Sequence, residues 1–195
     1  MNTLERHPMI LIVIGIMGIS LSSIFVKYAQ SPSVVTAAYR LLWTIILMTP
    51  AVICSKKYRQ ELLETSPKLV LLCILSGIFL ALHFTLWFES LNHTSVASST
   101  TIVCTEVIWV ALGWRLFLKG RLSGKACGAI AVTLAGSMLI AFSDSSGQGN
   151  HLYGDFLALL AAIAVAVYTL IGRIARATAS TTVYTYFVYV SAALT

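Results

Sequence analysis

The sequence predicts an all-α integral membrane protein built as a multi-helix transmembrane bundle. Its 195 residues are 58% hydrophobic and only 10% charged, an apolar share well above that of an ordinary soluble domain. The apolar residues form runs of about 20, which is the length that a helix needs to cross the hydrocarbon layer. The charged residues lie mostly between these runs, and their sign alternates from one gap to the next.

Six apolar windows are candidate spans, and a seventh begins near Val183. The six windows are 9–29, 34–53, 69–88, 94–114, 126–142 and 156–172. Pro32 separates the first two, because proline cannot continue a helix and disfavours helical backbone in the residue before it. The seventh window reaches Thr195 after about thirteen residues, which is too short to cross a membrane of ordinary thickness. We therefore expect the chain to be a fragment of a longer protein.

The charges in the gaps predict an orientation. The N-terminus and segments 55–68, 115–125 and 173–180 hold most of the 13 basic residues, namely Arg6, Lys56, Lys57, Arg59, Lys68, Arg115, Lys119, Arg121, Lys125, Arg173 and Arg176. Segments 30–33, 89–93 and 143–155 contain no Lys or Arg. By the positive-inside rule the basic segments and the N-terminus are cytoplasmic, and we expect a plasma membrane, such as the inner membrane of a bacterium. Because orientation explains the net charge of +6, we expect no nucleic-acid partner.

One acid lies inside a span. Glu106 is the single charged residue of window 94–114 and stands just past its middle. An ionisable group at that depth costs roughly 2.5–3.5 kcal/mol, so it normally faces a packed interior or an aqueous cavity. Ser99 and Trp109 fall at i−7 and i+3, on the same helical face. Two interpretations remain open: a proton or cation site, or a fixed ion pair with Arg40 that only stabilises the bundle.

Arg40 lies seven residues into the second window, ~10 Å below the outer surface at helical rise. Its guanidinium could bind a carboxylate or phosphate, or neutralise Glu106. It could equally extend toward the outer headgroups. The neighbouring Tyr39 and Trp43 could line the same cavity, or be packing or interfacial aromatics.

His83 and Lys27 are further candidates. His83 lies at a depth close to that of Arg40, and could be a hydrogen-bond partner between helices or a proton relay. Lys27 is near the outer end of the first window, where extension to the membrane surface is the usual role of a lysine.

Cysteine, histidine and glycine patterns indicate structural roles. Cys54, Cys73, Cys104 and Cys127 have neither zinc-ligand nor redox spacing, so we expect free thiols. Glu89 and His93 are four apart without further ligands, and we expect neither a metal nor a cofactor. Small-residue faces on the first and fifth windows predict close packing against other helices; their glycines are Gly15, Gly18, Gly124, Gly128 and Gly136.

Five stretches resemble the EamA type of the drug/metabolite transporter superfamily. They are GISLSSIFVKYA, SPSVVTAAYRLL, WFESLNHTSVASST, GRLSGKACGAIAVTLAGSMLI and GDFLALLAAIAVAVYTLIGRIAR. The five stretches follow the order and spacing of that family, and together they span nearly the whole chain. The resemblance implies a ten-helix fold of two inverted five-helix repeats. Residues 1–143 would form the first repeat, and residues 144–195 would begin the second with helix six and part of helix seven. A lysine recurs in that family at the place of Lys27.

The same resemblance implies a multi-pass transporter that exports or exchanges a small metabolite by alternating access, and proton coupling at Glu106 is one form this could take. The expected partners are a small-molecule substrate, the lipid bilayer, and either the missing C-terminal repeat or a second copy of the chain. The alternative is a membrane interaction or scaffold protein that transports nothing and whose buried charges are structural. No stretch resembles a catalytic motif, so we do not expect an enzyme.

Overall fold

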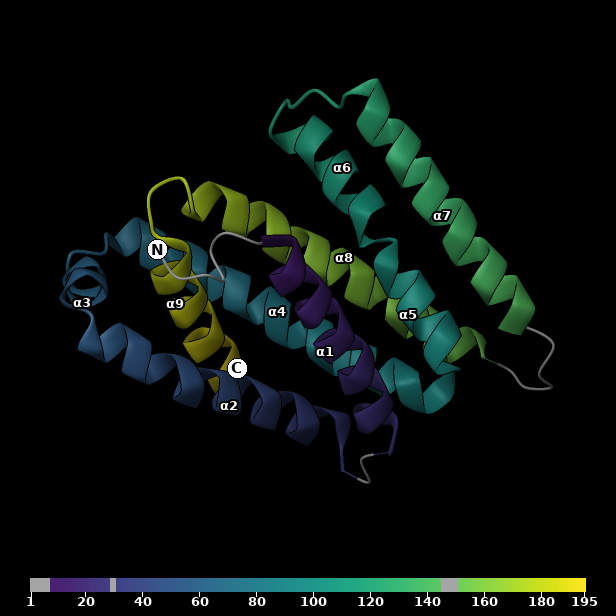
Figure 1. The fold of residues 1–195 in the computed structure, drawn as a ribbon, viewed down its shortest axis with the longest axis horizontal. Helices are drawn as coiled ribbons and strands as arrows, with labels where there is room; N and C mark the ends of the chain where they lie inside the picture. The colour runs from purple at the N-terminus through teal and green to yellow at the C-terminus, as the bar shows by residue number, and fades with distance from the viewer. Residues whose placement is uncertain (1–7, 29–30, 145–150) are drawn as a thin grey trace.

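A computed structural model describes residues 8–28, 31–144 and 151–195 of the chain (Figure 1). Within these residues the secondary structure is helical, in the order α1 (Pro8–Tyr28), α2 (Ser33–Cys54), α3 (Lys56–Leu63), α4 (Pro67–His93), α5 (Val96–Cys104), α6 (Glu106–Phe117), α7 (Gly124–Asp144), α8 (Leu152–Ala175) and α9 (Thr181–Leu194). Arg6 and residues 145–150, near the start of the predicted second repeat, lie outside the described residues.

The predicted apolar windows coincide with helices, which confirms the all-α membrane bundle. Among the described residues, four segments are long and apolar enough to cross a membrane: Ser33–Cys54, Pro67–His93, Val96–Phe117 and Leu152–Ala175. The first and fifth windows correspond to α1 and α7, which contribute the shorter apolar stretches Val13–Tyr28 and Gly124–Gly136. The seventh window corresponds to α9.

Two segments predicted as connections are helical. The 55–68 loop contains α3, a polar helix of eight residues, and α4 continues through the predicted 89–93 turn to His93. An apolar window ends at the first polar residues, but the backbone hydrogen bonds of a helix can continue through polar residues. At the other end of α4, Ser66 accepts a hydrogen bond from the backbone N–H of Leu69, and Pro67 occupies the first turn. Both are features that favour a helix start.

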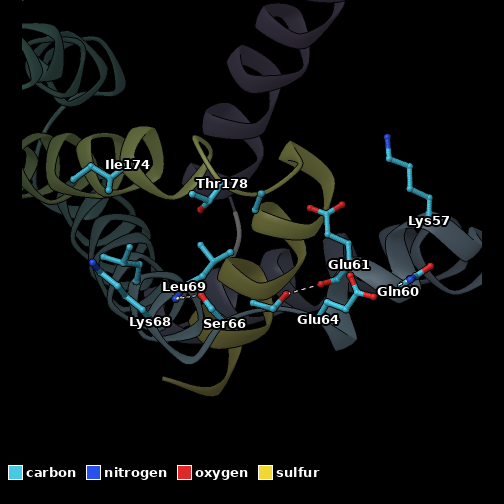
Figure 2. A pocket seen from close by; sticks show the side chains of 12 residues that line it. Lys57, Gln60, Glu61, Glu64, Ser66, Lys68, Leu69, Ile174 and Thr178 are labelled. Carbon is cyan, nitrogen blue, oxygen red and sulfur yellow. Dashed lines mark hydrogen bonds between the residues drawn. The ribbon is translucent and has the colours of Figure 1, made fainter.

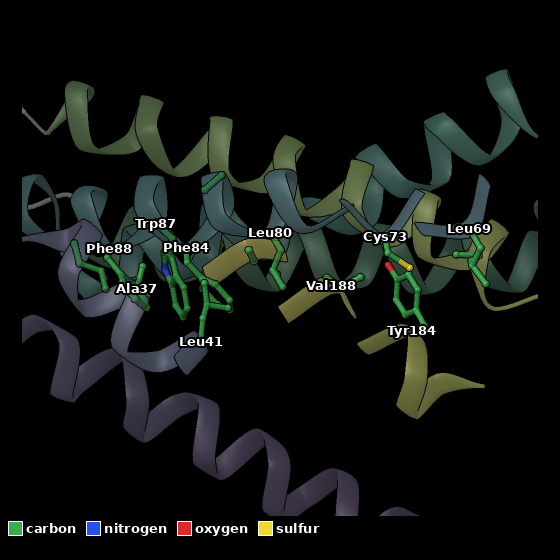
Figure 3. Close-up of a cluster of buried hydrophobic side chains, with 14 residues drawn as sticks. Ala37, Leu41, Leu69, Cys73, Leu80, Phe84, Trp87, Phe88, Tyr184 and Val188 are labelled. Carbon is green, nitrogen blue, oxygen red and sulfur yellow. The ribbon is translucent and has the colours of Figure 1, made fainter. Parts of the chain in front are cut away.

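The core forms where α4 packs along α8, with α2 and α9 on its flanks (Figure 1). α8 contributes small side chains to this core. Ala158, Ala161 and Ala162 are fully buried, and such residues let helix backbones approach closely. α4 contributes large aromatic side chains. Figure 3 shows Phe84, Trp87 and Phe88 beside residues of α2, and Cys73 beside Tyr184 of α9. The four cysteines, Cys54, Cys73, Cys104 and Cys127, are free thiols, as predicted.

The prediction of close-packed glycine faces on α1 and α7 was wrong in its choice of glycines. No atom of the described residues lies within 4 Å of a Cβ built at Gly15, Gly18, Gly124, Gly128 or Gly136. The glycines at close contacts lie elsewhere: Gly77 against α9, Gly113 against α8, Gly154 against the end of α4, and Gly172 against α9. Sequence spacing identifies a helical face of small residues, but whether another helix packs against that face depends on the arrangement of the bundle.

Contacts at the helix ends define two chemically different ends of the bundle. At the acidic end, Thr94 Oγ1 donates to Asp155 Oδ1 at 2.8 Å. At the basic end, the backbone N–H of Ser180 donates to Glu61 Oε1 at 2.5 Å. These contacts join segments that the charge alternation assigns to the same side of the membrane.

Candidate functional site

The fourth predicted span is a broken helix. The backbone N–H of Thr105 bonds to the carbonyl of Ile102, three residues earlier, at 3.0 Å, and its hydroxyl donates to the same oxygen at 2.6 Å. The N–H of Ile108 then bonds to the Thr105 carbonyl at 2.9 Å. These i→i−3 bonds make a tight turn between α5 and α6, and Thr back-bonding of this kind bends helices. The sequence predicted one continuous helix here, because hydropathy does not record backbone hydrogen bonding.

Glu106 is the first residue of α6 and is half-buried. The first turn of a helix has unpaired N–H groups and the positive end of the helix dipole, so it favours a carboxylate. Among the described residues, the Glu106 carboxylate forms neither a hydrogen bond nor an ion pair. The ion pair with Arg40, one of the two interpretations of Glu106, is therefore not formed.

Two buried polar atoms lie in the same broken span. The Thr100 hydroxyl of α5 and the Trp109 indole N–H of α6 have no hydrogen-bond partner within the described part of the chain. Trp109 follows Glu106 by three residues and shares its face of α6. Buried polar groups are nearly always satisfied, and each exception calls for an explanation. A carboxylate and an indole donor on one face, beside a helix break, can together bind a polar ligand.

Arg40 faces α1 and α4 and does not contact Glu106. Its Nη1 donates to Ser22 Oγ of α1 at 2.8 Å, and its Cζ lies 4.8 Å from the ring centroid of Phe84 and 5.9 Å from that of Phe88. Arg40 also lines a groove of about 520 Å³ against α1. The guanidinium is thus held over aromatic faces, a geometry that stabilises a partly buried cation.

His83 packs beside the same aromatics, in contact with α8. Its Nδ1 lies 2.9 Å from the carbonyl oxygen of Ala161, and its ring stacks on Trp87 with centroids 5.8 Å apart. The ring centroid of Phe84 is 5.1 Å away, so His83 and Arg40 both contact Phe84. The interhelical hydrogen bond predicted as one alternative is formed, with Nδ1–H as the donor to the carbonyl. A relay role for this histidine stays a prediction.

The remaining predicted site residues form no described hydrogen bond or ion pair with Glu106. Ser99 is fully buried, and its hydroxyl bonds to that of Ser90 at 2.5 Å. Tyr39 and Trp43 are each 60% exposed, a placement that fits interfacial aromatics. The Lys27 ammonium donates to the carbonyl of Leu91 and to that of Thr94, the latter at 3.2 Å. Lys27 therefore contacts the end of α4, and its extension to the membrane surface stays a prediction.

A polar hollow of about 670 Å³ lies at the basic end and was not predicted from the sequence. Figure 2 shows Lys57, Gln60 and Glu61 of α3 on one side of it, and Lys68 of α4 and Thr178 on the other. The signal was present, since Lys57, Gln60 and Glu61 follow the i, i+3, i+4 spacing of one helical face. Segment 55–68 was interpreted only as a connection between spans, so no helical face was predicted there.

The sequence was compared with models of known protein families, with curated proteins and with solved structures. A family model described as the EamA-like transporter family matches residues 7–142, which is more than half of the chain. No curated protein and no solved structure matches the chain.

Proposed function

The chain belongs to the EamA-like transporter family, and on that basis we propose that it carries a small polar metabolite across a plasma membrane by alternating access, with Glu106 as its proton or cation site. Membership of the family and the four segments of spanning length make it a multi-pass membrane protein. The proposal adds the mechanism, the N-inside orientation and the residues that carry it.

One observation supports this most strongly: Glu106 stands unpaired among the described residues at the start of the half-helix α6. Discontinuous spanning helices typically mark the ion and substrate sites of transporters, because their half-helix ends expose backbone dipoles inside the membrane. A carboxylate fixed in a salt bridge could not exchange its charge during a cycle. An unpaired one can accept a proton when the site is closed from water and release it when the site opens.

Arg40 is the proposed contact for an anionic group of the substrate. A guanidinium has five N–H donors, and the described structure assigns one hydrogen bond to it, that to Ser22. The remaining donors form a planar fork that suits a carboxylate or phosphate. The groove against α1 gives such a group an approach to Arg40.

The test replaces Glu106 by glutamine, which keeps the shape and removes the ionisation. Purified protein in liposomes that contain a pH-sensitive dye is exposed to a panel of amino acids, organic acids and amines. The unmodified protein should show proton movement with at least one compound, and Glu106→Gln should abolish it. Glu64→Gln, at the exposed residue that follows the end of α3, is the matched control and should leave proton movement unchanged.

The melting temperature in detergent separates the two interpretations. Under the transport proposal, Glu106→Gln melts close to the unmodified protein, because no described ion pair is lost. If Glu106→Gln transports normally, the acid is not the proton or cation site. If it unfolds at markedly lower temperature, the acid has a structural role. Either result overturns the proposal.

A further inference from the structure

A second hollow, of about 470 Å³, lies between α6, α7 and α8 at the basic end of the bundle. We name it the arginine pocket after three residues that line it, Arg121, Arg173 and Arg176. Its wall continues toward the middle of the spans along Val107 and Val110 of α6, with the apolar residues Ile130 and Leu170 from α7 and α8. The pocket thus has a cationic rim and an apolar wall.

The three arginines of this rim have no acidic partner in the part of the chain that the structure describes. Among the described residues, none of them forms an ion pair. Arg173 places its Cζ 3.8 Å from the ring centroid of Trp114, and Arg176 donates from Nε to the carbonyl of Gly172 at 3.1 Å. These contacts orient the two side chains while leaving their terminal N–H groups available. Three uncompensated guanidinium groups around one hollow favour an anion.

We propose that the arginine pocket binds the phosphate-bearing headgroup of an anionic lipid, with an acyl chain along the wall formed by Val107, Val110 and Leu170. Guanidinium groups match phosphate oxygens in pairs of parallel hydrogen bonds. Basic pockets between spanning helices, at the level of the headgroups, are suited to anionic lipid heads. A free phosphate ion would share the rim chemistry, but it would gain nothing from the apolar wall.

This site is separate from the proposed transport site. Glu106 and Arg40 do not line the arginine pocket, although its wall begins at Val107, one residue after Glu106. A lipid held there would pack against the half-helix α6 and fill the space between it and α8. The two proposals therefore stand or fall separately. If Glu106 has no role in transport, the lipid site can still exist, and if no lipid binds, Glu106 can still act in transport.

The experiment measures lipid binding to the purified chain in detergent by native mass spectrometry, with phosphatidylglycerol, phosphatidylcholine and inorganic phosphate as probes. Phosphatidylglycerol should bind and raise the melting temperature, whereas the zwitterionic lipid and inorganic phosphate should not. The double variant Arg173→Gln, Arg176→Gln should bind phosphatidylglycerol about thirtyfold more weakly, since each basic residue near an anionic headgroup contributes about fivefold.

Two further variants make the result specific. The matched control, Arg59→Gln with Arg115→Gln, removes two exposed arginines of the same end that do not line the pocket, and should bind within about threefold of the unmodified protein. Val110→Trp fills the apolar wall and keeps every arginine, so it should lose phosphatidylglycerol without depending on the folding of the arginine variants. Equal weakening by the control pair, retention of lipid by Val110→Trp, or equal binding of inorganic phosphate would each overturn the proposal.

Discussion

The ammonium group of Lys27 lies at the carboxyl end of α4, where it contacts the carbonyl oxygens of Leu91 and Thr94. The last carbonyls of a helix have no partner within the helix, and they form the negative end of its dipole. A cation at this position therefore gains both hydrogen bonds and a favourable field. Lys27 connects α1 to the turn between α4 and α5, two segments that are more than sixty residues apart in sequence.

Replacing Lys27 by methionine should lower the free energy of unfolding by about 1 kcal/mol, because the carbonyls at the end of α4 lose a charged donor. Lys27→Arg keeps the charge and should recover most of the loss. Denaturant unfolding in detergent measures both. Lys57→Met, which removes an exposed lysine of α3, is the control and should change stability little. Equal stability of Lys27→Met and the unmodified protein would show that the contact contributes nothing.

Individual side chains also show what sequence can and cannot predict. The depth of Glu106 and of His83 follows from counting residues along an apolar window. Their partners do not, because a hydrogen bond such as that from His83 to Ala161 depends on how α4 lies on α8. Ser99 illustrates the same limit: helical spacing placed it on the face of Glu106, but the turn at Thr105 intervenes and Ser99 bonds to Ser90 of α4.

At the scale of elements, the turn at Thr105 divides one span into two half-helices. Thr105→Val keeps the size and β-branching of the side chain and removes the hydroxyl that bonds to the Ile102 carbonyl at 2.6 Å. A straighter helix should follow, because Thr back-bonding favours a bend. The expected result is unchanged or slightly higher thermal stability together with reduced proton movement in the liposome assay. Thr133→Val, which removes a hydroxyl bond to the carbonyl of Ala129 four residues earlier on α7, should leave transport unchanged.

The contact between α4 and α9 permits a second test at this scale. A Cβ added at Gly77 would lie 2.6 Å from the Cβ of Ser191 and 2.8 Å from the carbonyl oxygen of Val188. Gly77→Ala should therefore separate the two helices and cost about 1–3 kcal/mol of stability. Gly128→Ala on α7 is the matched control, because no described residue lies within 4 Å of its added methyl group. That change should be neutral or slightly stabilising. A stable Gly77→Ala variant would contradict the close approach.

At the scale of the whole molecule, the fold class and the position of nearly every helix follow from the sequence. Apolar length determines them, and the solvent, a bilayer, imposes that length on each span. The boundary near residue 143 remains a prediction. In the structure α8 packs against α4, and α9 packs against both α4 and α2, so the two predicted units share one core. Sequence spacing can suggest a repeat, but it does not show whether neighbouring repeats interleave.

The two ends of the bundle allow the orientation itself to be tested. In a chain whose four cysteines are replaced by serine or alanine, one cysteine is introduced either at Ser31, exposed at the acidic end, or at Lys57, exposed at the basic end. A membrane-impermeant maleimide applied to intact cells should label Ser31→Cys and should reach Lys57→Cys only after lysis, because basic segments are retained in the cytoplasm. The opposite labelling would place the arginine pocket in the outer leaflet. It would also show that the alternation of charge, consistent along the whole chain, does not set the topology of this protein.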